Sequence, residues 1–229
     1  MKSNKKRSFT TSLILALGLL LVIAPAGYLA YRQQKAAERD LRATALEENL
    51  ESGIAEIADS DNRDKKEEKR ELNQLRPKPE PADKLLSDTA VGVVRIDKID
   101  VLLPIYGDSS DQSLLDGAGM LEGTALPTSE KNSVSVLTGH RGGRNGDQTF
   151  MHIDKLAIDD EIKVTTKDEV LYYKVKEQEI IEPTDWSRFT KEEDKSKLIL
   201  MSCHPYPSDR QRILVKAELS KSISKKQGE

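Results

Sequence analysis

Cys203 is the residue of this sequence best suited to covalent chemistry, and it is the single cysteine among 229 residues. It ends the strand-like run 197–203 and precedes the turn-rich segment 204–209, so we expect it at a strand tip beside a cleft. A free cysteine usually behaves as a small buried hydrophobic residue, and this interpretation stays open. To act as a nucleophile, the thiol instead needs a neighbouring base or imidazolium that holds it as a thiolate.

Three histidines could supply that group. His204 directly follows Cys203, and consecutive residues of an extended chain point to opposite faces. His152 lies in a segment that we expect to be helical, where a partly exposed structural position is the simpler interpretation. His140 follows the strand-like run 133–138 and opens a glycine-containing turn, so it stands at a strand end. We therefore favour His140 as the partner of the cysteine.

Two arginines follow the cysteine, and a fixed cation is one way to stabilise a developing oxyanion. Arg212 enters the strand-like run 212–219, and eight residues separate it from Cys203. If the two runs are antiparallel neighbours, this loop brings both side chains to one cleft. Arg210 lies inside the loop. The alternative, that both arginines are solvated surface residues, stays open.

Short apolar or alternating runs, separated by turns rich in glycine and proline, fill the C-terminal part of the chain. Such runs predict strands, and seven of them in about 130 residues indicate a compact all-β barrel or sandwich. They cover residues 91–96, 101–106, 133–138, 161–166, 169–181, 197–203 and 212–219. Two other segments, 111–118 and 149–156, are expected to form short helices.

Residues 9–31 are an uncharged run of 23 residues that follows a basic tail, 1–8. As a helix rising about 1.5 Å per residue, the run would be roughly 35 Å long, enough to cross a hydrocarbon core of about 30 Å. We expect a transmembrane signal anchor here. A cleaved signal peptide is the alternative, because residues 24–26 have the small-x-small form of a cleavage site. Basic residues flank both sides of the run, so charge alone decides its orientation only weakly.

Residues 32–82 are rich in charge of both signs, with a thin helical stripe of apolar residues that continues to about Ala58. We expect a solvated, partly helical stalk. Three prolines between 77 and 81 remove backbone donors and predict a semi-rigid, extended linker at its end. The catalytic domain is expected over 83–220, and a polar tail over 221–229.

The composition argues against several classes of function. A net charge of −3 predicts no polyanion-binding surface, so nucleic acid is not an expected partner. One cysteine and three histidines are a poor set of ligands for a four-coordinate zinc site. The chain has no nucleotide-binding glycine motif. We therefore expect neither a cofactor nor a metal.

Four stretches of the sequence resemble the sortase family, especially the class C, pilus-type sortases of Gram-positive bacteria. They include TGHRG around His140 and LMSCHPYPSDRQRILVKA around Cys203 and Arg212, and the resemblance extends over about 91–219. It implies a closed eight-stranded β-barrel with short helices. It also implies a catalytic triad of Cys203, His140 and Arg212, and a single-pass location in the cell membrane with the catalytic domain outside the cell.

The resemblance implies a cysteine transpeptidase that cleaves an LPxTG-like sorting signal between Thr and Gly. The acyl group would pass to an amine, either a pilin lysine or a cell-wall cross-bridge, so that surface proteins are anchored or polymerised. No metal or nucleotide is implied. The alternatives are a catalytically inactive, membrane-tethered scaffold or binding protein, a housekeeping-type sortase, and a cysteine peptidase that releases the acyl group to water.

The sequence departs from the usual class C pattern in three places. Before the nucleophile, Ile199 stands where the family usually has a threonine, whereas Ser202 keeps a hydroxyl next to Cys203. The segment 77–90 has no aromatic residue of the kind that a class C lid carries, so we expect no lid. The polar tail 221–229 predicts no second transmembrane helix. Pilin polymerisation is therefore less firmly implied than sortase chemistry.

Overall fold

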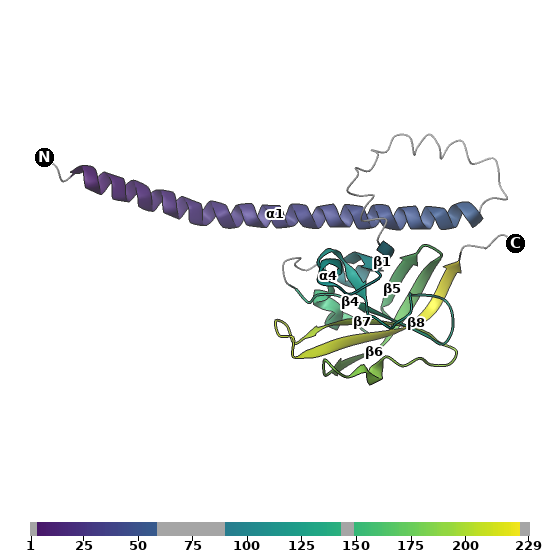
Figure 1. The fold of residues 1–229 in the computed structure, drawn as a ribbon. Coiled ribbons are helices and arrows are strands. Elements are labelled where there is room, and N and C mark those ends of the chain that lie inside the picture. The colour runs from purple at the N-terminus through teal and green to yellow at the C-terminus, as the bar shows by residue number, and fades with distance from the viewer. Residues whose placement is uncertain (1–3, 59–89, 143–148, 225–229) are drawn as a thin grey trace. The chain divides into compact units, whose positions relative to one another are not determined.

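The computed structural model describes residues 4–58, 90–142 and 149–224. Figure 1 shows a long helix followed by a β-barrel. The helix is α1 (Asn4–Ala58). The strands are β1 (Ala90–Ile96), β2 (Val101–Tyr106), β3 (Ala118–Met120), β4 (Ser133–Thr138), β5 (Glu161–Thr166), β6 (Glu169–Ile181), β7 (Ser196–His204) and β8 (Gln211–Ser224). Short helices are α4 (Asp111–Asp116) and the 3-10 helices η2 (Asp97–Ile99), η4 (Phe150–Lys155) and η5 (Trp186–Arg188).

The strands close into a barrel in the order β1-β2-β3-β4-β7-β8-β6-β5. Two neighbouring pairs are parallel, β2 with β3 and β4 with β7, and the other pairs are antiparallel. The predicted eight-stranded barrel is confirmed, as are all seven strands that the alternating runs predicted. The sequence pattern missed β3, because a strand of three residues is too short to show alternation.

Alternate residues of the strands point to opposite faces of the barrel wall, and each face has its own apolar cluster. The large cluster fills the barrel and includes Leu137, Leu198, Leu200, Ile213 and Val215. A smaller one, here called the outer cluster, consists of Val134, Val136, Ile181, Ile199 and Leu214, with Leu121, Phe189 and Met201 packed against it. The central strands β4, β7 and β8 are therefore apolar on both sides.

The membrane anchor predicted at residues 9–31 is not supported. Crossing a hydrocarbon core of about 30 Å takes roughly 20 predominantly apolar helical residues. Within the described part of the chain, no helix is both long enough and apolar enough to meet that need. This finding contradicts the predicted single-pass location in the cell membrane.

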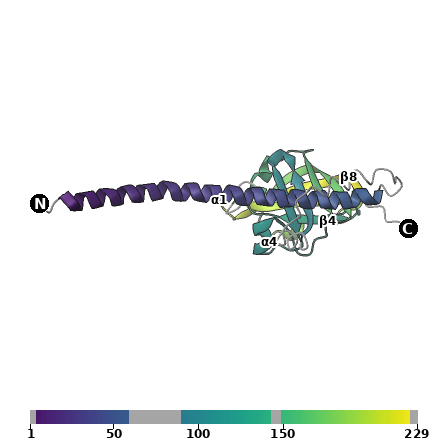
Figure 2. The same ribbon diagram turned by 90° about the horizontal axis from the view of Figure 1, so that it is seen from above.

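The helical stripe predicted as far as about Ala58 lies within α1, but the last part of this helix is not the solvated stalk that we expected. Residues 39–58 belong to the same compact unit as the barrel. Ala43, Glu47 and Ile54 are buried. The two views in Figures 1 and 2 show this part of the helix running along the barrel.

Charged side chains join this part of α1 to the barrel wall. The guanidinium of Arg95 on β1 donates to both carboxylate oxygens of Glu47, with Nε–Oε2 at 3.0 Å. Lys163 on β5 lies 3.0 Å from Glu47 and 2.5 Å from Glu51. Residues 59–89 lie outside the described residues. The predicted proline linker falls there, and so does nearly all of segment 77–90, in which we expect no lid.

Candidate active site

Cys203 lies next to the last residue of β7, and β8 is its antiparallel neighbour. In the register of this pair Cys203 lies directly opposite Arg212. Residues opposite one another on antiparallel strands project from the same face, with Cβ atoms about 4.5–5.5 Å apart. The two runs are therefore antiparallel neighbours, as the expected approach of these two side chains requires.

His140 follows β4, which pairs in parallel with the other edge of β7. The last paired residues are Thr138 and Met201. Beyond them the backbone N–H of Gly139 donates to the carbonyl oxygen of Met201 at 3.1 Å. The hydroxyl of Ser202 donates to the carbonyl oxygen of Gly139 at 2.7 Å. Continuing this register by two residues brings His140 alongside Cys203, on a chain about 4.8 Å away.

From this register we expect the three predicted site residues to form a row at the ends of three adjacent strands, with Cys203 in the middle. They continue the alternation of the outer cluster, since Ile199 and Leu214 share their face of β7 and β8. His140 is exposed, whereas Cys203 and Arg212 are half-buried. The row is thus reachable from solvent and adjoins an apolar surface.

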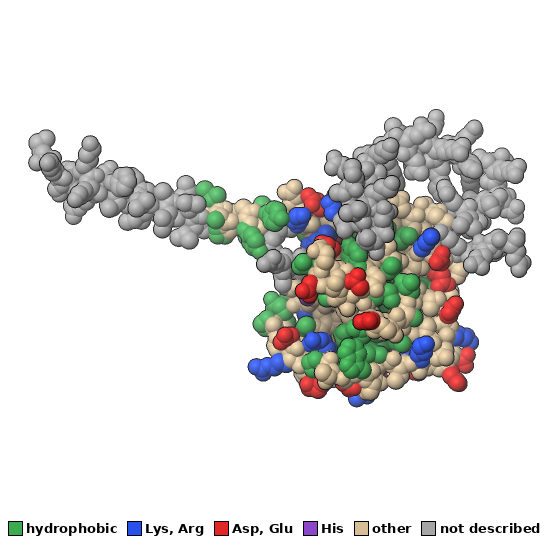
Figure 3. All heavy atoms as spheres, in the orientation of Figure 1, with side chains coloured by type: hydrophobic (Ala, Val, Ile, Leu, Met, Phe, Trp, Pro, Cys, Tyr) green, Lys and Arg blue, Asp and Glu red, His purple; other side chains and the backbone are tan. Residues whose placement is uncertain are grey.

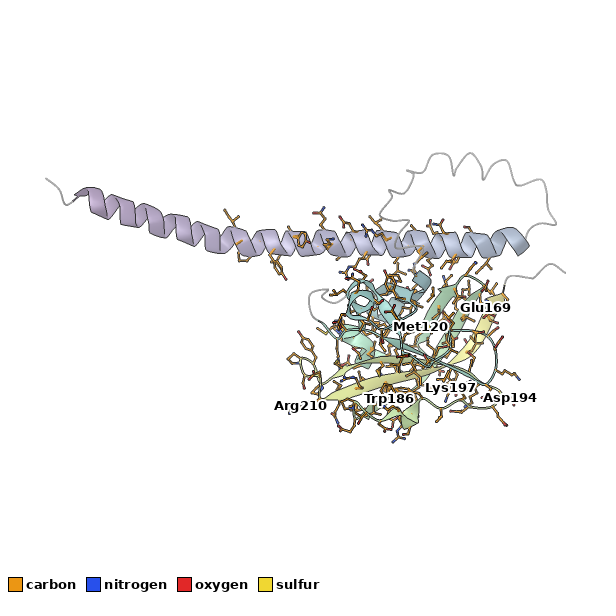
Figure 4. All side chains as sticks on the ribbon, viewed as in Figure 1. Met120, Glu169, Trp186, Asp194, Lys197 and Arg210 are labelled. Atoms are coloured by element: carbon orange, nitrogen blue, oxygen red, sulfur yellow. The ribbon has the colours of Figure 1, made fainter. Side chains whose placement is uncertain are left out.

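Two backbone contacts orient Arg212. Its Nη1 donates to the carbonyl oxygens of Asp209 at 2.8 Å and Gln211 at 2.9 Å. Both bonds use one terminal nitrogen, which leaves Nε and Nη2 to donate to a substrate oxygen. Arg210, labelled in Figure 4, lies in the exposed β7–β8 loop at the end of the barrel away from Glu169 and Asp194. It is outside the strand register that pairs Arg212 with the cysteine.

The other two histidines are not part of this row. His204 is the next residue of β7 after Cys203, and its Nδ1 lies 2.8 Å from Nη1 of Arg141. His152 lies in η4, so the short helix expected over 149–156 is confirmed as a 3-10 helix. The sequence reasoning did not single out Arg141; its position directly after His140 was the available signal.

The outer cluster lies on the same strand faces as the row, with Met201 and Leu214 each two residues from a member of the row. Leu121 from the β3–β4 connection and Phe189 from the β6–β7 connection pack on the outer cluster. Trp186 is 60% exposed and makes an edge-to-face contact with Phe189, with ring centroids 5.9 Å apart. Figure 3 shows hydrophobic side chains gathered on the visible barrel face.

The described residues offer no obvious metal centre. Over 4–58, 90–142 and 149–224, no group of three or more His, Cys, Asp or Glu side chains gathers closely enough to hold an ion. The chemistry available to the row is that of a thiol beside an imidazole and a guanidinium, which suits acyl transfer through a thioester.

A β-barrel with such a row on its outer face defines a candidate thiol acyl-transfer protein. The sortase domain model matches residues 94–220, more than half of the chain. The chain therefore belongs to the sortase family, whose members are cysteine transpeptidases of cell-wall surface-protein sorting.

Solved structures of class C sortases are similar to this chain. The pilus island 1 sortase C2 of group B Streptococcus is 34% identical, with 63% of this chain and 82% of that one covered and a TM-score of 0.57. Sortase C of Streptococcus pneumoniae, whose structure bears on pilin substrate specificity, is 31% identical, with 64% and 74% covered and a TM-score of 0.57.

A characterised relative from another branch also matches. Sortase D of Bacillus subtilis (strain 168) is 28% identical over 117 residues, which is 51% of this chain. The chain spans 56% of the length of that relative. The similar proteins thus include both a pilus-island sortase C2 and a sortase D.

Proposed function

We propose that this chain is a cysteine transpeptidase that cleaves an LPxTG-like sorting signal between Thr and Gly and joins the acyl group to an amine. The single observation that carries the proposal is the row of His140, Cys203 and Arg212 across β4, β7 and β8. Cys203, in the middle, is the nucleophile. His140 transfers protons, and Arg212 stabilises the oxyanion. Membership of the sortase family supports the same assignment.

In the first half of the reaction, the Cys203 thiolate attacks the carbonyl carbon of the Thr residue. The C–N bond to Gly breaks, and the imidazolium of His140 gives its proton to the departing glycine amine. The product is a thioester between Sγ and the threonine acyl group. Arg212 donates to the carbonyl oxygen while that oxygen carries negative charge, and this contact stabilises the tetrahedral intermediate.

In the second half, an incoming amine attacks the thioester carbonyl. Its nitrogen loses a proton to the imidazole of His140, and Cys203 leaves as a thiolate. The imidazolium and thiolate are then regenerated, so the cycle is balanced without an oxidant, reductant or nucleotide. The thioester keeps the acyl group activated, which is why amide bond formation needs no other energy source.

The apolar surface beside the row supports the substrate class. A sorting signal offers a leucine and a proline ahead of the scissile bond, and both need a surface that excludes water. The outer cluster, with Leu121 and Phe189 on its border, supplies such a surface next to Cys203. Burying one leucine side chain there is worth about 2 kcal/mol.

A pilin lysine is the acceptor that we favour, because the solved structures named above are class C sortases and one of them is a pilus-island enzyme. A cell-wall cross-bridge amine is the second candidate acceptor. Both amines would enter from the exposed side of His140.

Mass spectrometry of the full chain incubated with an LPxTG peptide tests the proposal. The peptide is offered with a pilin-type lysine peptide in one reaction and an oligoglycine cross-bridge mimic in the other. Ligated product carrying the threonine acyl group supports the transpeptidase, and the preferred amine identifies the acceptor. Hydrolysed peptide alone would indicate a cysteine peptidase, and an unchanged peptide would indicate a binding or scaffold protein.

A further inference from the structure

Arg141 follows His140 directly, and its guanidinium is held by three partners at once. Nε donates to the carbonyl oxygen of Met151 at 3.3 Å. Nη2 lies 2.6 Å from Oδ2 of Asp154, and Nη1 lies 2.8 Å from Nδ1 of His204. The side chain is only 6% exposed. Each of its three nitrogens thus has its own fixed partner.

The contact with His204 joins the two chain segments that carry the proposed catalytic pair. Arg141 is the residue after His140, and His204 is the residue after Cys203. His204 lies in β7, so alternation turns its side chain to the face opposite that of Cys203, and Arg141, in the bend after His140, contacts it there. The bond between them therefore spans the gap between the β4 and β7 chains without touching the reacting atoms.

The chemistry of the pair fixes the state of the histidine. A guanidinium has only N–H donors, so Nδ1 of His204 must accept the hydrogen bond. Asp154 balances the charge of the guanidinium, which a buried arginine requires.

The turn that follows is packed just as closely. Gly142 has a φ of +85°, a left-handed conformation that favours glycine. A Cβ atom at this position would lie 2.6 Å from the ring of Tyr206, which belongs to the β7–β8 loop. Gly139, on the other side of His140, lies against the ring of Phe150, the first residue of η4.

We infer that Arg141 is a positioning residue, which holds the His140 turn and the Cys203 end of β7 at the separation that proton transfer needs. The inference rests on the proposed function for the role of the row. A displacement of about 1 Å between reacting groups can cost on the order of 10²-fold in rate. Loss of the Arg141 contacts can therefore lower the rate strongly. Its effect is expected on kcat, because it does not line the peptide surface.

The variants Arg141→Met and His204→Leu each remove one side of the contact, and the double variant removes both. We expect each single variant to lower kcat by about tenfold or more with KM changed less than twofold, the signature of lost transition-state stabilisation. The double variant should be no worse than Arg141→Met, because the two residues act as one unit. His204→Asn, which keeps an acceptor near the position of Nδ1, should retain most of kcat.

Arg95→Met is the matched control for a general loss of stability. Arg95 is also ion-paired, to Glu47 at the α1 contact, far along the chain from the row. We expect this variant to lower the melting temperature with kcat unchanged. If Arg95→Met lowers kcat as much as Arg141→Met at the same loss of melting temperature, or if the Arg141 and His204 effects add fully, the positioning role is overturned.

Alkylation of Cys203 by iodoacetamide gives a readout that does not need turnover. In Arg141→Met the His140 turn should be less well held, so His140 should stabilise the Cys203 thiolate less. Alkylation should then slow by about fivefold or more in Arg141→Met, but not in Arg95→Met. An unchanged rate would overturn the inference even in a protein that ligates peptides. If Arg141→Met slows alkylation but the native protein does not ligate peptides, the proposed function alone is overturned.

Discussion

Cys203 and Arg212 are direct cross-strand partners at the ends of β7 and β8. Because the pair is antiparallel, neither side chain can change faces without a one-residue slip of the whole strand. The β7–β8 pairing runs without a register shift from Lys197 to His204, so the position of the cation relative to the sulfur is fixed by the sheet.

This relationship predicts that Arg212→Lys lowers kcat/KM by at least about tenfold although the charge is kept. A lysine ammonium cannot both cap the carbonyl oxygens of Asp209 and Gln211 and present a planar fork to the substrate. Steady-state ligation kinetics measure the effect. Arg210→Lys in the adjoining loop is the control and should stay within twofold of the native rate; a reversal of the two results would assign the role to Arg210.

Cys203→Ala is expected to abolish ligation and hydrolysis while leaving the fold intact. The substitution removes only the sulfur from a half-buried strand end, and the backbone pairing with Arg212 remains. Peptide turnover by mass spectrometry and thermal unfolding by circular dichroism check the two halves of the prediction. Residual ligation above a hundredth of the native rate would exclude Cys203 as the nucleophile.

His140→Ala is expected to reduce kcat by at least about 10³-fold, because the glycine amine then leaves without a proton. His152→Ala should keep kcat within threefold, since His152 lies in η4 and outside the row. Single-turnover thioester formation and steady-state rates both report on the loss. Equal losses in the two variants would argue that the base is not the residue alongside Cys203.

Ser202→Ala should lower both the free energy of unfolding and kcat. The buried hydroxyl of Ser202 donates to the carbonyl oxygen of Gly139, which immediately precedes His140. Without it a buried carbonyl loses its donor, at a cost of about 1–2 kcal/mol in the free energy of unfolding. Ser202→Thr keeps the hydroxyl and should restore both stability and kcat; a Thr variant as impaired as the Ala variant would contradict this role.

The sequence predicted most of the barrel because its strands carry a regular alternation, and β2, β4, β5 and β6 have the predicted bounds. Other features depend on distances between residues far apart in the chain. Arg141 and His204 are 63 positions apart, and no local pattern relates them. The sequence also did not predict that α1 packs on the barrel. The apolar stripe of α1 is thin, and its main contact is made by the charged Glu47 with residues far along the chain.

The pairing of Glu47 with Arg95 and Lys163 predicts a pH-dependent stability. Burial on its own would raise the pKa of Glu47, but hydrogen bonds and charge from Arg95 and Lys163 outweigh it and hold that pKa below the ordinary value of 4.5. A carboxyl whose pKa is lowered by folding stabilises the folded state above its unfolded pKa. That contribution should be complete above about pH 5.5 and disappear as the pH falls through the lower folded pKa.

Glu47→Gln tests this relationship. At pH 7 the variant should lose about 2 kcal/mol of the free energy of unfolding, because two cations are left without their buried partner. The difference from the native protein should shrink below pH 4, where the native carboxyl is also becoming protonated. Urea unfolding between pH 3 and pH 7 measures both quantities. Glu193→Gln, at an exposed position of the β6–β7 connection, is the control and should change the free energy by less than about 0.5 kcal/mol at every pH. A constant difference between Glu47→Gln and the native protein across this range would show that Glu47 stabilises α1 by packing and not by its charge.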